Sequence, residues 1–176
     1  MDALKAIKTQ PKMTYVWNKK KIYTDAIKKL NKAEAILIVP INYVDITETP
    51  SSLVYMCTHH GGFIFDLIML KEEQIGKELV DIVKSNKIKF VFSKFMTFYF
   101  LNIDMRQNIP NVYEIEFLSK REFGYGVCKS RIPHSTEFNI DDVDWSLRPF
   151  KSNEQFKAGT RLYELLMTND IKLKRR

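Results

Sequence analysis

The chain has 176 residues, 45% of them hydrophobic and 28% charged, with a net charge of +7. This composition suits one globular domain with its own core and excludes a disordered chain. Two cysteines are too few for a secreted disulfide framework, no apolar signal segment opens the chain, and the apolar stretch 90–103 is too short for a transmembrane helix. We therefore expect a single domain, 1–176, that is intracellular (cytoplasmic or nuclear) and has no membrane contact.

The first third of the chain predicts a strand, a helix and a second strand. Residues 13–17 are apolar and β-prone, and residues 25–34 carry apolar side chains at helical spacing. Residues 35–44 form a continuous β-branched run that is typical of a buried strand. Pro40 lies inside this run, so we expect the strand either to lie at a sheet edge or to break there.

The middle of the chain predicts a hairpin, a helix and a long strand. Two apolar runs, 53–58 and 63–70, flank a Gly-Gly pair, which is typical of a β-hairpin turn. Residues 71–85 have apolar positions at helical spacing. Residues 88–103 are rich in aromatic and β-branched side chains, which favour a bent strand over an amphipathic helix.

The remaining elements complete the predicted fold. Residues 112–118 alternate, with Glu114 and Glu116 expected on the wet face, and 123–129 continue a second hairpin. A capping-box pattern opens a helix over 152–167. The sequence therefore predicts an α+β fold, with a mostly antiparallel sheet built from hairpins and about three helices packed on it.

The positive charge is concentrated at the two ends of the chain. Residues 1–32 hold nine lysines against two aspartates, and residues 170–176 carry a net charge of +3, so the body between them is acidic. We expect this basic N-terminal segment and short basic C-terminal tail to contact phosphates, although lysine-rich ends can also be simple solubilising segments. The expected nucleic-acid-binding residues are Lys19, Lys20, Lys21, Lys28, Lys29, Lys172, Lys174, Arg175 and Arg176.

All cysteines and histidines fall in two short segments. Cys57, His59 and His60 are at the first hairpin, and Cys128 and His134 follow the second. If the segments meet, Cys57, His59, Cys128 and His134 form a Cys2His2 zinc set, with His60 as a substitute for His59. Neither segment has the close ligand spacing of a zinc motif, so we favour the alternative of buried cysteines and exposed turn histidines, and no cofactor other than zinc is predicted.

An acidic loop holds Asp141, Asp142 and Asp144, which could bind a divalent cation, as in a nuclease, or could be a solvated surface. No phosphate-binding glycine motif and no nucleophile elbow occurs in the sequence.

Three functions follow in order of preference. The first is a small DNA- or RNA-binding accessory protein, and the abundance of Lys, Ile and Asn suggests a viral or mobile-element genome. The second is a protein-interaction module that binds a host factor without nucleic acid. The third is a small metal-dependent nuclease. The first two functions involve no catalysis. We expect that this chain is not an enzyme.

Overall fold

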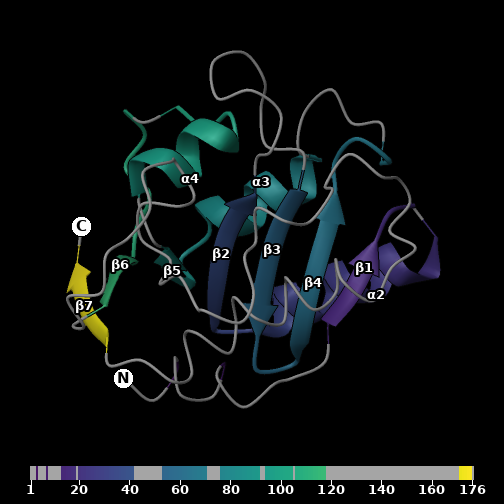
Figure 1. Cartoon of the computed structure of the whole chain (residues 1–176), viewed down its shortest axis with the longest axis horizontal. Helices are drawn as coiled ribbons and strands as arrows, with labels where there is room; N and C mark the ends of the chain where they lie inside the picture. The colour runs from purple at the N-terminus through teal and green to yellow at the C-terminus, as the bar shows by residue number, and fades with distance from the viewer. Residues whose placement is uncertain are drawn as a thin grey trace, which may run out of the picture.

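The computed structural model describes residues 3, 7, 13–18, 20–41, 53–70, 76–91, 94–104, 106–117 and 171–175. The strands are β1 (Met13–Val16), β2 (Ala35–Ile41), β3 (Leu53–Thr58), β4 (Gly61–Asp66), β5 (Ile88–Val91), β6 (Val112–Phe117) and β7 (Ile171–Arg175). The helices are α2 (Lys21–Lys32), α3 (Lys77–Lys84) and α4 (Lys94–Phe100). One sheet with helices packed on it confirms the α+β class (Figure 1).

The sheet is mixed in direction, so the prediction of a mostly antiparallel sheet needs revision. Its order is β1-β4-β3-β2-β5-β6-β7. β3 is antiparallel to both β2 and β4, and β6 is antiparallel to β7, whereas β1–β4, β2–β5 and β5–β6 are parallel pairs. Parallel neighbours need a crossover connection, and here α3 precedes β5 while α4 precedes β6.

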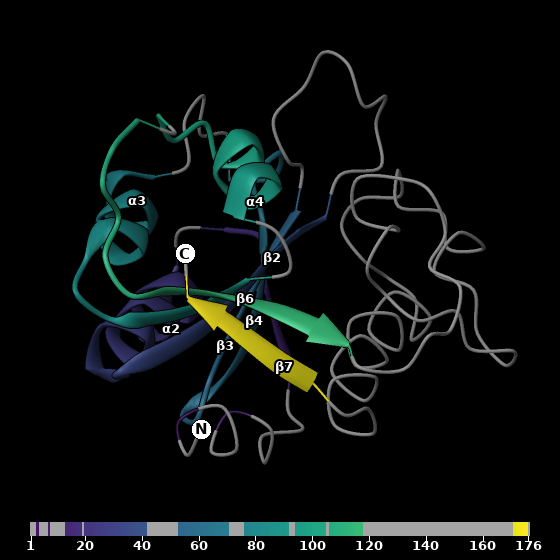
Figure 2. The same ribbon diagram turned by 90° about the vertical axis from the view of Figure 1, so that its left-hand side faces the viewer.

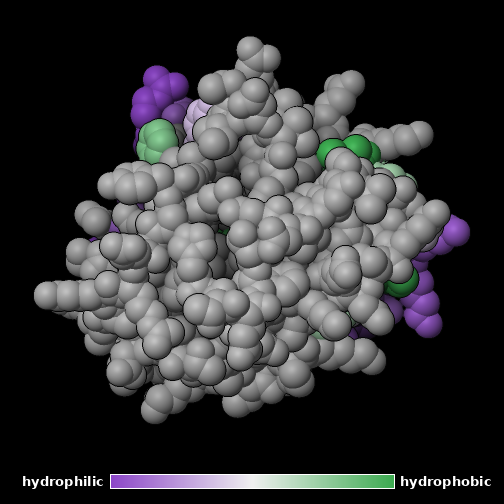
Figure 3. Space-filling model, in the orientation of Figure 1, coloured by the Kyte–Doolittle hydropathy of each residue, from purple (hydrophilic) through white to green (hydrophobic). Residues whose placement is uncertain are grey.

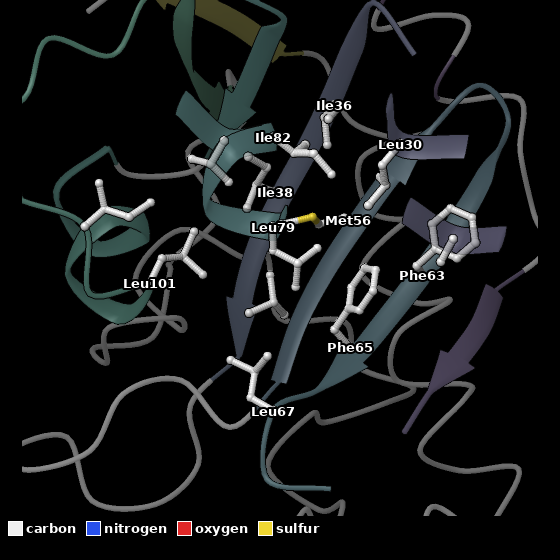
Figure 4. Packing of buried hydrophobic residues seen from close by; sticks show 14 of the residues in the cluster. Leu30, Ile36, Ile38, Met56, Phe63, Phe65, Leu67, Leu79, Ile82 and Leu101 are labelled. Atoms are coloured by element: carbon white, nitrogen blue, oxygen red, sulfur yellow. The ribbon is translucent and has the colours of Figure 1, made fainter. Parts of the chain in front are cut away.

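Helices α2 and α3 lie on the same face of the sheet (Figure 2). Their buried residues recur at helical spacing, namely Tyr23, Ala26 and Leu30 in α2 and Leu79, Ile82 and Val83 in α3. These side chains pack on alternate residues of the strands, including Ile36, Ile38, Met56, Phe63 and Phe65 (Figure 4). Burial of each large apolar side chain stabilises the fold by about 1.5–3 kcal/mol. Among the described helices, none is long and apolar enough to cross a membrane.

The long strand predicted over 88–103 is wrong in its second half, which forms α4. The helix is closed at its carboxyl end because Asn102 takes a φ of 51°, and the N–H groups of Asn102 and Ile103 donate to Tyr99 and Phe98 carbonyls. Phe98 is fully buried against the sheet. Tertiary packing and this helix end outweigh the strand preference of the aromatic side chains.

The turn of the β3–β4 hairpin is also displaced from its predicted position. The two turn residues are His59 and His60, whereas Gly61 already pairs with Thr58 as the first residue of β4. Gly61 has a φ of 147°, a conformation that side chains disfavour, so glycine is required here for the backbone and not for the turn itself. Thr58 Oγ1 accepts the His60 N–H at 3.0 Å.

Pro40 lies in a central strand and yet at a local edge. The pairing of β2 with β5 ends at Ile38, whereas its pairing with β3 continues to Ile41. Pro40 therefore has a ladder partner on one side only, which its missing N–H permits. The predicted second hairpin, 123–129, and the predicted helix, 152–167, lie outside the described residues.

Candidate nucleic-acid interface

The strands β2, β5 and β6 are parallel, so their carboxyl ends point to the same edge of the sheet. β2 ends at the top of the sheet in Figure 1, where α4 also lies. The chain leaves β2 toward β3 on one side and returns to β5 on the other, so the strand order reverses between these neighbours. In open sheets with parallel strands, ligands bind in the crevice outside such carboxyl ends. Helix α4 follows β5 at this edge. We therefore treat this carboxyl edge as the candidate functional site.

Glu114 anchors α4 to the sheet. The prediction that Glu114 lies on the wet face is wrong, because its side chain is only 6% exposed. Its register opposite Val91 turns it toward α4, where Oε1 accepts the Lys94 N–H at 2.7 Å. A carboxylate at the first turn satisfies a helix N–H group and favours the helix dipole. The position of α4 thus depends on this buried carboxylate.

Two aromatic rings stand on the exposed side of α4. Phe95 is 57% exposed and Tyr99 is 51% exposed, although both are large apolar side chains. Their ring centroids are 6.1 Å apart and their planes differ by 10°, so they form a stacked pair one turn apart. Thr97 and Phe98, on the other side of the helix, are buried. Parallel aromatic faces at a site edge can stack with other planar rings, such as nucleic-acid bases.

The sequence does not reveal this aromatic pair, because the aromatic and β-branched residues of 88–103 predict a strand. A strand places Phe95 and Tyr99 on the same face as Thr97, at every second position. A helix separates them from Thr97 and brings the two rings together. The two rings are therefore neighbours only because this segment is helical.

The second buried carboxylate, Asp66, is occupied within the fold. The hydroxyl of Tyr15 donates to Asp66 Oδ2 at 2.6 Å, and the Met69 N–H donates to Oδ1 at 3.0 Å. These bonds offset the cost of burying the charge. Among the described residues there is no group of three or more His, Cys, Asp or Glu side chains that could hold a metal ion. The acidic cluster 141–144 lies outside the described residues.

The predicted N-terminal binding residues occupy α2 and the residue before it. Lys20, Lys21, Lys28 and Lys29 are all exposed, and Lys19 lies outside the described residues. At the right-hand rim of Figure 3, where Figure 1 draws α2, hydrophilic side chains lie beside hydrophobic ones. These lysines are available to an anionic partner.

The C-terminal residues form a strand and not the expected tail. In the pairing of β7 with β6, Lys174 lies opposite Glu114, and Lys172 lies opposite Glu116. Arg175 is exposed, and Arg176 lies outside the described residues. Lys172, Lys174 and Arg175 therefore belong to the last strand of the sheet.

The hairpin residues proposed as zinc ligands differ in their surroundings. Cys57 is fully buried, and burial raises the pKa of its thiol to about 11 despite a hydrogen bond with Tyr55 that lowers it. A raised pKa disfavours the thiolate that zinc needs. His59 and His60 lie at the turn, with ring centroids 3.8 Å apart. The other proposed ligands, at 128 and 134, lie outside the described residues, so the zinc site stays a prediction.

No protein-family model matches the sequence, and no curated protein matches it. Its fold, however, matches solved structures. The EXO domain of Nibbler from Aedes aegypti has a TM-score of 0.60 at 13% identity, covering 88% of this chain and 84% of that domain. Trypanosoma brucei RNase D in complex with RNA U12 has a TM-score of 0.59 at 16% identity, covering 92% of this chain and 63% of that one.

A third match is RNase D of Escherichia coli, an exoribonuclease involved in structured RNA processing. Its TM-score is 0.57 at 13% identity, and the matched region covers 89% of this chain and 43% of that one. The chain therefore shares the fold of these ribonuclease domains, and it spans less than two thirds of the two RNase D proteins. At such low identity the likeness shows the fold alone. It also corrects the expectation of a viral or mobile-element protein, because the matched structures are ribonuclease domains of cellular organisms.

Proposed function

We propose that this protein is an RNA-binding domain built on the exoribonuclease fold, which binds single-stranded RNA at the carboxyl edge of its sheet. The observation that carries the proposal is the likeness of fold to a ribonuclease crystallised with RNA, which extends over 92% of this chain. The charge distribution predicts a nucleic-acid partner without separating DNA from RNA. The likeness to a ribonuclease favours RNA as that partner.

Two features of the described residues support this choice of ligand. Phe95 and Tyr99 offer parallel aromatic faces at the edge where such folds bind ligands, and bases of single strands stack on aromatic side chains. The net charge of +7 favours a polyanion, and the exposed lysines of α2 supply part of it. Stacking and phosphate contacts together are the usual means of binding a single strand without strong sequence preference.

The direct test is fluorescence anisotropy with a labelled 12-nucleotide uridine RNA in EDTA. We expect binding that weakens steeply as salt rises from about 50 to about 200 mM, because each neutralised phosphate releases counterions. Duplex DNA of the same length is the control, and it should bind more weakly because its bases are not free to stack. Absence of binding to the uridine RNA at about 50 mM salt would remove the proposal.

A metal-dependent nuclease is the second candidate, and the exoribonuclease fold favours it. Metal-assisted hydrolysis needs carboxylates that are free to hold the ions. At the carboxyl edge Glu114 already holds the Lys94 N–H, so the ligands of this candidate would have to include residues outside the described ones, such as Asp141, Asp142 and Asp144.

Incubation of the bound RNA with Mg²⁺ or Mn²⁺, followed by a denaturing gel, separates the two candidates. Shortening of the RNA that EDTA stops, and that the triple substitution Asp141→Asn, Asp142→Asn and Asp144→Asn abolishes, supports the nuclease. Intact RNA with unchanged affinity in EDTA supports the binding domain.

A further inference from the structure

A second basic surface lies at the amino edge of the sheet, opposite the carboxyl edge. Helix α2 ends at this edge, and β2 begins there at Ala35. The β3–β4 turn lies beside it, at the lower edge in Figure 1, because Cys57 pairs with Leu37 near the start of β2. The first residue of β5, Ile88, donates its N–H to the Glu34 carbonyl at 2.9 Å. Three connections of the chain thus meet at this edge.

These connections bring five cationic or titratable side chains together. We call them the basic edge: Lys29 and Lys32 of α2, His59 and His60 of the turn, and Lys87 before β5.

The members of the basic edge are held by named contacts. Lys29 Nζ lies 5.9 Å above the centre of the Phe63 ring, so the side chain lies over the hairpin. Lys87 Nζ donates to the carbonyl oxygens of Asn31 and Ala33 at 2.7 Å each, which secures the carboxyl end of α2. An ammonium has three N–H donors, so Lys87 retains one for a ligand.

The charges that act on His60 within this edge are all positive. The pKa of this exposed histidine is lowered by a loss of hydration and then by the charges of His59, Lys32 and Lys29. Glu34 is exposed at the same edge, and it is not among the charges that shift this histidine. Repulsion among cations that are held close together is relieved when an anion binds.

We propose that the basic edge binds the phosphate backbone of single-stranded RNA, as a second contact at the end of the sheet opposite Phe95 and Tyr99. The inference rests on the proposed function and adds a position for the backbone. There Lys29 and Lys32, from the predicted basic N-terminal segment, lie beside His59, His60 and Lys87, which were not predicted to contact phosphate. Lysines give point contacts to phosphates, and a protonated histidine adds a donor. Two contacts at opposite edges of the sheet also require an RNA long enough to reach both.

The first test compares two matched charge reversals in the anisotropy assay with the 12-nucleotide uridine RNA. Lys32→Glu changes the basic edge, whereas Lys77→Glu makes the same change in net charge at the exposed first residue of α3, away from that edge. We expect Lys32→Glu to weaken binding several-fold more than Lys77→Glu. The double variant Lys29→Glu/Lys32→Glu should reduce the salt slope by about 1.4, since each single-strand phosphate contact contributes about 0.7.

The second test uses pH, because a histidine that contacts phosphate gains a proton on binding. Affinity of the natural chain should rise as pH falls from about 8 to about 5.5, through the range where histidine titrates, and uridine gains no proton there. His59→Gln/His60→Gln should flatten this dependence.

The outcomes separate the inference from the proposed function. If the natural chain does not bind the RNA, the proposed function fails and the inference fails with it. If the chain binds, but Lys32→Glu and Lys77→Glu behave alike and the histidine variant keeps its pH dependence, the inference alone is wrong. Circular dichroism of each variant should match the natural chain, since all the substituted side chains lie at the surface or in the turn.

Discussion

The stacked pair on α4 gives the most direct test of where RNA binds. Replacing Phe95 or Tyr99 by alanine removes one of the two aromatic faces at the carboxyl edge. Base stacking on an aromatic side chain contributes about 1–3 kcal/mol. The two residues are only 57% and 51% exposed, so the lower part of this range applies. We therefore expect each alanine variant to bind about 5- to 12-fold more weakly.

Anisotropy with the 12-nucleotide uridine RNA measures the effect, and two variants serve as controls. Tyr99→Phe keeps the ring and should bind like the natural chain. Ile22→Ala removes an apolar side chain of α2 that is 43% exposed, and it should leave affinity unchanged. The double variant Phe95→Ala/Tyr99→Ala should lose less than the product of the single effects, because neighbouring contacts couple. A double variant with natural affinity and an unchanged circular dichroism spectrum would refute the role of α4.

Three further predictions concern the buried polar groups. A double-mutant cycle of Tyr15→Phe and Asp66→Asn, measured by urea unfolding, should give a coupling free energy of about 1.5–3 kcal/mol, because the buried Tyr15 hydroxyl donates to the Asp66 carboxylate. Additive changes in the free energy of unfolding would contradict this prediction. Burial lowers the pKa of Lys89 to about 8, so the unfolded chain holds this proton more tightly, and stability should rise between about pH 8 and 10.5, but not in Lys89→Met. In Cys128→Ser, the thiol of Cys57 should react with a disulfide reagent only on unfolding; rapid labelling of the native protein would show that the thiol is accessible.

The elements that the sequence predicted well are those with a complete local pattern. Helix α2 follows from Ala26 and Leu30 at helical spacing, and the first hairpin follows from two apolar runs beside glycine. The predicted boundaries moved because turn position depends on which glycine needs a positive φ. Gly61 has the positive φ, and its pairing with Thr58 places it inside β4. Local residue types indicate that a turn exists, and pairing decides where it lies.

The candidate site could not be predicted because it depends on contacts distant in sequence. Helix α4 is stabilised by Glu114, twenty residues later, and by burial of Phe98 on the sheet. Neither contact is visible in the residues of α4, whose aromatic content indicates a strand. The basic edge is hidden for the same reason, since Lys32, His60 and Lys87 are neighbours only after the sheet forms. Charge concentrated at the two ends was visible in the sequence, but its position on the surface was not.

The pairing of β7 with β6 changes how the C-terminal residues can be studied. β7 covers one side of β6, and its removal would leave a row of unpaired N–H and C=O groups there. Such an open strand is a template for another copy of the chain, so a protein truncated before residue 171 should tend to aggregate. Loss of RNA binding after truncation would then reflect self-association and not the missing charge. Replacing Lys172 and Lys174 by threonine, a residue that suits strands, removes the charge and retains the covering strand.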